Sequence, residues 1–276
     1  MQQFVQISDE LKIRYISIGQ GQPIIFIPGW TMTADAFNRS LKPFSERFQA
    51  ISYDPRSHGR STRLKSGNDY AQHGRDLAAF IGELGLKDVV LVGWSSGALA
   101  AYAYFQQFGY GNARAFVSID MSPKPLMESE SDWGIDTREN IRLMLASATA
   151  PDHSLMVNTF ASQIYRSDPA DEIYIQGMIQ QSLNMDPHIA ALLLADVNLC
   201  DYTEVASTTA AKLPVLHVVR QQALAEARKW MDANAPDAEL YALGGHMMFW
   251  EHAERFNRVV ARFLDAKLHA QRGAGN

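Results

Sequence analysis

One serine lies where a side chain could act as a nucleophile. Residues 93–97 read Gly-Trp-Ser-Ser-Gly, so Ser95 has a glycine two positions away on each side. An apolar run precedes this pentapeptide, and a helical, small-residue segment from Ala98 to Phe108 follows it. A G-x-S-x-G sequence between a strand and a helix is typical of a tight turn that exposes a nucleophilic serine. The glycines remove side chains that would collide with neighbouring elements, and the helix start favours a developing negative charge.

Apolar runs that alternate with helical patterns supply the frame for this turn. Short continuous apolar runs, typical of strands buried on both faces, occur at Pro23–Gly29, Phe48–Tyr53, Val89–Val92, Ala115–Asp120 and Leu213–Val219. Helical periodicity separates them, and the first 19 residues resemble an antiparallel strand pair. The alternation predicts an α/β fold with a mainly parallel sheet covered on both faces. Ligands of such sheets bind beyond the carboxyl ends of the strands.

The pattern changes in the second half of the chain. From about Leu126 to Thr209 we find helical patterns and turns only, with helix starts at residues 136–137 and 186–187. We therefore expect a core domain formed by residues 1–122 and 210–276, and a helical cap formed by residues 123–209. Most apolar side chains of the cap should pack on the core, and a subset should face a cleft. They include Leu143, Met144, Met156, Phe160, Tyr165, Met178, Leu192 and Leu193.

Four segments together resemble the α/β-hydrolase fold family. They are PIIFIPG, YDPRSHGRS, the pentapeptide around Ser95, and GGHMMFWEHAERFN near the C-terminus. The similarity extends over nearly the whole chain. It implies a mainly parallel eight-stranded sheet flanked by helices, with an all-helical cap inserted after the sixth strand. It also implies a serine hydrolase that acts on carboxylic ester-type bonds.

The resemblance also implies roles for individual residues. His246 matches the histidine that takes the proton from the nucleophile and later returns it. The backbone N–H groups of Trp30 and Ser96 match the two donors of the oxyanion hole, which stabilise the developing negative charge. We expect Trp30, Trp94, Met32 and Trp133 to line a pocket for a small apolar or aromatic substrate.

The acid that would orient His246 departs from the commonest family pattern. Most members place an aspartate just after the penultimate strand, but LHVVRQQALAEARKW has no acid before Glu226, which lies within a helix. Asp120 stands at the carboxyl end of AFVSID, where the strand would direct it towards the same site. We therefore predict Asp120 as the acid. Three alternatives stay open: Asp120 binds only the backbone of its turn, Glu226 takes the role, or no acid is used.

Three functions are compatible with these residues. We expect a hydrolase that cleaves an ester, thioester or lactone of a small apolar substrate through an acyl-enzyme. The chain also resembles the cofactor-free 3-hydroxy-4-oxoquinoline 2,4-dioxygenases in Pro-Gly-Trp, in the position of the acid and in Gly-Gly before the histidine. In that chemistry the histidine acts as a base and the substrate anion reacts with O₂. Two further histidines of that branch are replaced here by Met32 and Trp94. A non-catalytic receptor for a small ligand is the third hypothesis.

Composition and short motifs exclude several other classes of protein. The 276 residues carry a net charge of −5, which argues against a general nucleic-acid binder. Cys200 is the single cysteine, so no intramolecular disulfide or thiolate cluster is expected. We find no metal-ligand spacing and no phosphate-binding loop, and expect no metal or other cofactor. No signal-peptide pattern and no membrane-spanning apolar run occurs, so we expect a cytoplasmic protein. The sequence leaves the oligomeric state open.

Overall fold

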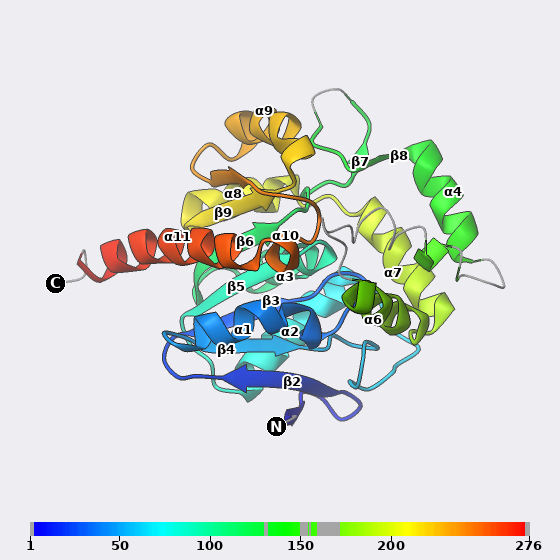
Figure 1. The fold of residues 1–276 in the computed structure, drawn as a ribbon, viewed down its shortest axis with the longest axis horizontal. Helices are drawn as coiled ribbons and strands as arrows, with labels where there is room; N and C mark the ends of the chain where they lie inside the picture. Colours follow the sequence, from blue (N-terminus) through cyan, green and yellow to red (C-terminus); the bar gives the residue numbers. More distant parts are fainter. Residues whose placement is uncertain (1–2, 130–131, 150–153, 155, 159–171, 274–276) are drawn as a thin grey trace.

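An eight-stranded sheet forms the centre of the computed structural model, which describes residues 3–129, 132–149, 154, 156–158 and 172–273 (Figure 1). The strand order is β1-β2-β4-β3-β5-β6-β9-β10. β2 pairs antiparallel with β1 and β4, and all other neighbours in this sheet are parallel. The mainly parallel sheet is therefore confirmed. Its strands are β1 (Gln3–Gln6), β2 (Lys12–Ile18), β3 (Pro23–Ile27), β4 (Gln49–Tyr53), β5 (Val89–Trp94), β6 (Ala113–Ile119), β9 (Val215–Val219) and β10 (Glu239–Ala242).

Helices cover both faces of this sheet. α1 and α11 pack together on one face, and α2 and α3 pack together on the other (Figure 1). α8 packs against both α3 and α9, and the short α10 leads into α11. The bounds are α1 (Asn38–Ser45), α2 (Tyr70–Glu83), α3 (Ser96–Phe108), α8 (Thr203–Lys212), α9 (Leu224–Asn234), α10 (Met248–Glu251) and α11 (Ala253–Gly273). The sequence did not predict α1, because Pro43 interrupts an eight-residue segment whose burial depends on tertiary contacts.

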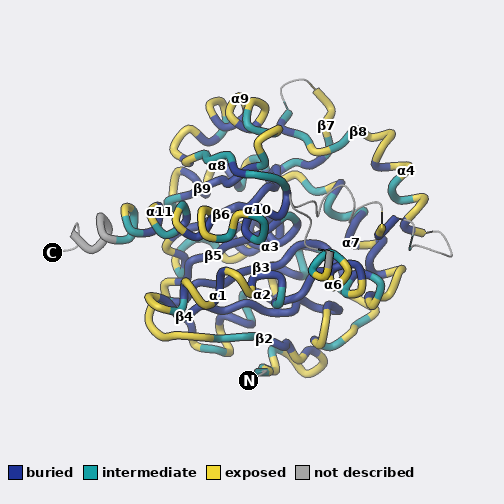
Figure 2. Tube along the Cα trace, viewed as in Figure 1, coloured by how far each residue is buried: buried dark blue, intermediate teal, exposed yellow. Residues whose placement is uncertain are grey.

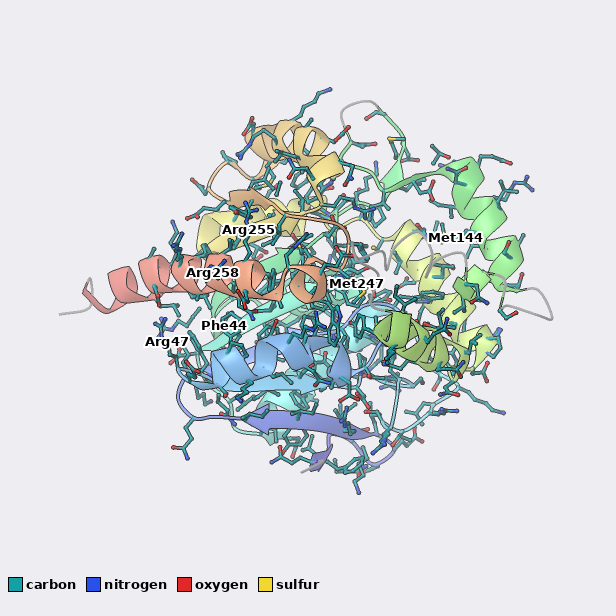
Figure 3. All side chains as sticks on the ribbon, in the orientation of Figure 1. Phe44, Arg47, Met144, Met247, Arg255 and Arg258 are labelled. Carbon is teal, nitrogen blue, oxygen red and sulfur yellow. The ribbon has the colours of Figure 1, made fainter. Side chains whose placement is uncertain are left out.

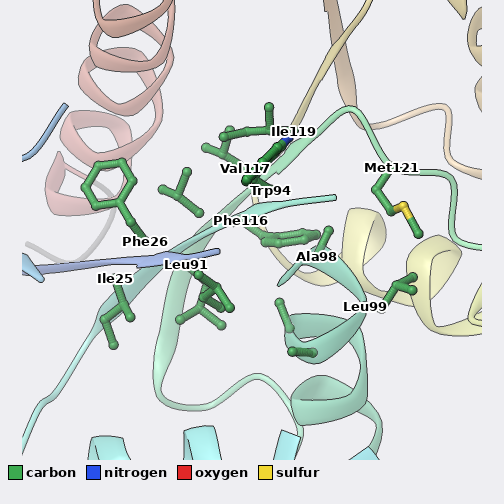
Figure 4. Close-up of a cluster of buried hydrophobic side chains, with 14 of the residues drawn as sticks. Ile25, Phe26, Leu91, Trp94, Ala98, Leu99, Phe116, Val117, Ile119 and Met121 are labelled. Atoms are coloured by element: carbon green, nitrogen blue, oxygen red, sulfur yellow. The ribbon is translucent and has the colours of Figure 1, made fainter. Parts of the chain in front are cut away.

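The core lies along the central strands. Every residue of β3, β5 and β9 is buried, and in β6 only Arg114 is exposed (Figure 2). The strand register places Leu91 and Phe116 on the side that faces α3, and Phe26 and Val117 on the opposite side (Figure 4). Burial on both faces explains why these strands read as continuous apolar runs without alternation.

The segment between β6 and β9 contains most of the remaining helices. α4 (Arg138–Ala148), α6 (Glu172–Leu183) and α7 (Pro187–Leu199) lie beside one end of the sheet (Figure 1). The predicted helix starts are confirmed, since Thr137 and Asp186 accept hydrogen bonds from backbone N–H groups of the first turns of α4 and α7. A pair of two-residue parallel strands, β7 (Leu126–Met127) and β8 (Asp136–Thr137), adds to the predicted helices. Phe160 and Tyr165 lie outside the described residues.

α2 and α3 approach each other closely at Gly74. A Cβ at this position would lie 2.7 Å from the carbonyl carbon of Ala103 and from the backbone nitrogen of Tyr104. Backbone atoms of a packed helix cannot move aside as the end of a flexible side chain can. The absence of a side chain at Gly74 therefore sets the distance between α2 and α3, the helix that begins at Ser96.

We expect Gly74→Ala to lower the free energy of unfolding by about 1–3 kcal/mol, because the methyl group would force α2 away from α3. Gly82→Ala is the matched control in the same helix, since nothing lies within 4 Å of a Cβ at that position. The control should raise the free energy of unfolding by about 0.5 kcal/mol through the lower entropy of the unfolded chain. Urea unfolding measures both, and equal effects would contradict a close contact at Gly74.

Candidate active site

Ser95 occupies a strained turn between β5 and α3. Its backbone has φ 52° and ψ −130°, in a region that residues with side chains rarely adopt. Gly93 and Gly97 make the turn possible. A Cβ on Gly93 would lie 2.6 Å from the Cα of Ala98, and one on Gly97 would lie 2.3 Å from the carbonyl oxygen of Ile27. The two glycines are therefore required by backbone contacts on both sides of Ser95.

The next strand brings Asp120 to the same end of the sheet. β6 pairs with β5, and the backbone N–H of Ser95 donates to the carbonyl of Ile119, which precedes Asp120, over 2.9 Å. Asp120 also has a positive φ, 49°, and its N–H donates to Val218 of β9 over 2.8 Å. The carboxyl ends of β5, β6 and β9 thus meet at these two strained residues.

His246 contacts Asp120 directly. The loop between β10 and α10 carries His246, and its ring Nδ1 lies 2.5 Å from Oδ2 of Asp120. The His246 side chain is 9% exposed and the Asp120 side chain 2% exposed. Because a carboxylate can only accept, this contact assigns the proton of a neutral ring to Nδ1 and leaves Nε2 without one. An imidazole in this tautomer can accept a proton at Nε2.

The side chain of Trp94 is hydrogen-bonded to the backbone of the His246 loop. Its indole N–H donates to the backbone carbonyl of His246 over 3.0 Å, and the two ring centroids are 5.4 Å apart. Because Trp94 directly precedes Ser95, this bond connects the loop of His246 to the turn of Ser95. Trp94 is fully buried and also packs edge-on against Phe249.

The environment of Asp120 favours its charged form. Burial alone would raise the pKa of this carboxyl. The hydrogen bond and charge of His246, together with the charge and backbone N–H of Arg220, outweigh burial and hold the pKa below its ordinary value. Asp120 is therefore an ionised acceptor at neutral pH. Glu226, the alternative acid, is exposed in the first turn of α9, whereas Asp120 bonds the ring of His246.

Arg220 is a part of this site that the sequence did not predict. It directly follows β9, where the family resemblance would place an aspartate. Its backbone N–H donates to Oδ1 of Asp120 and its Nε to Oδ2, each over 2.8 Å. Its Nη2 lies 3.4 Å from Nδ1 of His246. An arginine after a buried strand is itself an unspecific signal, so only the fold reveals these contacts.

The turn that carries Trp30 is held by the helices inserted between β6 and β9. The indole N–H of Trp30 donates to the carbonyl of Ala190 in α7 over 2.8 Å. The hydroxyl of Thr31, a residue with φ 62°, lies 2.7 Å from that of Ser182 in α6. The Thr33 hydroxyl donates to the side chain of Gln181 over 2.7 Å. Contacts far apart in the sequence therefore shape this turn.

A second set of bonds supports the same turn from the sheet. The carboxylate of Asp54, at the end of β4, accepts from the backbone N–H of Ala34 over 2.8 Å and from that of Arg60 over 2.9 Å. His58, in the same loop, is buried with Nδ1 2.7 Å from the carbonyl of Arg56. Burial lowers the pKa of His58 to about 4, so its ring is neutral. Asp54 and His58 thus support the turn from buried positions, whereas Arg60 of the same loop is exposed.

The other predicted residues lie around this centre. Ser96 is buried and begins α3, where backbone N–H groups of the first turn lack partners within the helix. Met32 is fully buried. Trp133 packs with its ring centroid 5.5 Å from that of His217 and 6.0 Å from that of Trp230. The expected pocket-lining role of Trp30, Trp94, Met32 and Trp133 stays a prediction.

Two surface cavities lie away from these residues. One is lined by residues such as Phe44, Arg47 and Arg258, between α1 and α11 (Figure 3). The other includes Lys87 and Arg114 at the opposite end of the strands from Ser95. Within the described ranges, no three His, Cys, Asp or Glu residues gather into a possible metal site. Among the same residues, no helix has the length and apolar character needed to cross a bilayer.

Comparison with known proteins places this arrangement in a family. A non-heme haloperoxidase of Rhodococcus erythropolis is 35% identical over 130 residues, 47% of each chain. A bifunctional esterase/perhydrolase of Acinetobacter calcoaceticus is 30% identical over 132 residues, 47% of this chain and 48% of that one, so the chain spans about half the length of these curated relatives. The crystal structure of a bromoperoxidase from Bacillus anthracis has the same fold, with a TM-score of 0.87, 19% identity, and coverage of 96% of this chain and 100% of that one. The alpha/beta hydrolase family pattern matches residues 24–259, and the protein belongs to that family.

Proposed function

We propose that the protein is a serine hydrolase that cleaves an ester, thioester or lactone through an acyl-enzyme. The observation that carries this proposal is the bond between His246 Nδ1 and Asp120 beside the strained turn of Ser95. Ser95 attacks the substrate carbonyl carbon, His246 accepts the hydroxyl proton at Nε2, and Asp120 stabilises the imidazolium. The proton then passes to the leaving group, and water, activated by His246, releases the acid and regenerates Ser95.

Two backbone donors complete the proposed mechanism. The N–H groups of Trp30 and Ser96 would stabilise the oxyanion formed after attack by Ser95. Such fixed donors are worth several kcal/mol of barrier in enzymes of this type, about 3–4 kcal/mol for a single donor. The position of Ser96 at the start of α3 supports its role, because the helix dipole favours negative charge there.

We assign the substrate to the class of small apolar or aromatic compounds. In this proposal residues 123–209 form a cap over the site, and Trp30, Trp94, Met32 and Trp133 contribute to the pocket. The bond from Trp30 to α7 supports it, because it places an inserted helix against the turn beside Ser95. α7 is rich in apolar side chains, with Ile189, Leu193 and Leu194 buried.

The relatives favour perhydrolysis as a second activity of the same site. Their names include a haloperoxidase and an esterase/perhydrolase. Hydrogen peroxide would then replace water in attacking the acyl-enzyme, and the products would be a peracid and free Ser95. We expect peracid to form from a carboxylic ester and hydrogen peroxide, and this formation to disappear in Ser95→Ala. Peracid production that survives in that variant would contradict a shared acyl-enzyme.

We expect Ser95→Ala to abolish turnover of p-nitrophenyl esters and covalent labelling by a fluorophosphonate, because both reactions require the Ser95 oxygen. Ser45→Ala is the control, since its hydroxyl donates to the carbonyl of Lys42 in α1, outside the proposed site. Labelling that persists in Ser95→Ala would refute the nucleophile. Turnover that survives in this variant but needs O₂ would favour the ring-cleaving dioxygenase, and an intact bound ligand without turnover would favour the receptor hypothesis.

Asp120→Asn should lower kcat by a factor of about 10³–10⁴ with little change in KM. The amide would donate to His246 and favour the tautomer with its proton on Nε2, as in the serine-protease substitution that supplies this magnitude. Glu226→Gln is the comparison that separates the two candidate acids. We expect it to retain full kcat. A loss in Glu226→Gln but not in Asp120→Asn would move the role of the acid to Glu226.

A further inference from the structure

Among the described residues, three hydrogen bonds reach the Asp120 carboxylate, and Arg220 supplies two of them. Oδ1 accepts from the Arg220 backbone N–H, and Oδ2 is shared between Arg220 Nε and His246 Nδ1. Only 2% of the Asp120 side chain is exposed, against 33% of the Arg220 side chain. The buried carboxylate therefore depends on these two residues for most of the hydrogen bonding that water would otherwise provide.

The backbone around Arg220 connects the loops of Asp120 and His246. Leu243 donates to Val219 over 2.9 Å, and Gln221 donates to Gly244 over 3.1 Å. These two bonds tie the loop that carries His246 to the residues on either side of Arg220. The Arg220 N–H then reaches across to Asp120 on the other side. A single short segment thus fixes the relative position of the acid and the histidine.

We propose that Arg220 is a positioning residue that orients Asp120 towards His246 and places a fixed positive charge beside the imidazole ring. A guanidinium only donates and is always protonated, so Asp120 must act as an acceptor towards both neighbours. The same cation lies 3.4 Å from Nδ1 of His246 and opposes the addition of a second proton to the ring. The catalytic consequence rests on the proposed function, whereas the effect on the histidine does not.

Few other ionisable groups contact the His246 loop within the described residues. Asp120 at the end of β6 and Arg220 after β9 face the ring directly. From α10, the carboxylate of Glu251 accepts from the N–H of Gly245, and burial raises the pKa of Glu251. The ring of His252, the residue after α10, lies beside Gly244 of the same loop. Trp94 of β5 contributes an uncharged ring. A substitution of Arg220 keeps the ionisable side chains of Asp120 and Glu251, and Arg220→Lys, which keeps the positive charge, separates the effect of that charge from the orientation of Asp120.

The test compares Arg220→Gln and Arg220→Lys with the wild type and with Arg114→Gln. Arg114 is a matched control because it pairs with Asp88 at the opposite end of the strands. In Arg220→Gln we expect the acid limb of kcat/KM for a p-nitrophenyl ester to move up by about one pH unit, because protonation of His246 becomes easier. We expect kcat at the optimum to fall by about tenfold, with KM unchanged, because Asp120 loses its orientation. In Arg220→Lys we expect the acid limb to return to its wild-type pH but kcat to recover only in part. An ammonium keeps the positive charge but lacks the planar set of N–H donors of a guanidinium.

An NMR titration of the His246 ring in the free enzyme gives a second readout that needs no turnover. Its midpoint should rise in Arg220→Gln, return towards the wild type in Arg220→Lys and stay unchanged in Arg114→Gln. If both the acid limb and the NMR midpoint of Arg220→Gln match the wild type, the inference is overturned. If Arg220→Gln does not fold, Arg220→Lys with wild-type kcat and wild-type pH profile would overturn it, and reduced kcat with a preserved limb would support it. A shifted NMR midpoint together with active Ser95→Ala would reject the hydrolase proposal and retain this one.

Discussion

The site depends on one buried carboxylate that must stay ionised. Asp120 is almost completely removed from water, and desolvation by itself would favour its protonated form. Donors from two separate loops compensate, one on His246 and two on Arg220. If these loops moved apart, an uncompensated charge would remain inside the protein, which is among the costliest defects a fold can contain. The requirement to satisfy Asp120 therefore constrains the loops after β6, β9 and β10 together.

Backbone strain at the same end of the sheet is sustained by close packing. Ser95 and Asp120 both have positive φ, a conformation that costs roughly 1–3 kcal/mol at each such residue. The buried central strands and the close backbone contacts at Gly93 and Gly97 leave the turn no relaxed alternative. The packed core thus sustains a strained, half-buried Ser95 at the start of a helix.

The inserted helices have a structural role in addition to any role in substrate binding. Three side chains in the turn after β3 bond to α6 and α7, although these helices lie about 150 residues further along the chain. The turn contains Trp30, a proposed oxyanion donor, so a displacement of α6 or α7 would change the geometry beside Ser95. Asp54 binds the same turn from the sheet side. The core and the inserted segment therefore both determine the conformation of this turn.

The sequence alone determined the central strands, most of the helices and the position of the candidate nucleophile. Strands buried on both faces and amphipathic helices produce hydrophobic patterns within short stretches of sequence. The glycines around Ser95 are likewise required by steric contacts within a single turn. It also indicated His246 and Asp120, with Glu226 as an open alternative. Only the tertiary structure decided that Asp120 contacts His246, that Arg220 donates to Asp120, and that Trp94 supports the histidine loop. These contacts join residues about 100 to 150 positions apart, and no local pattern encodes which strand ends meet. Strand order and the need to satisfy buried polar groups make that choice.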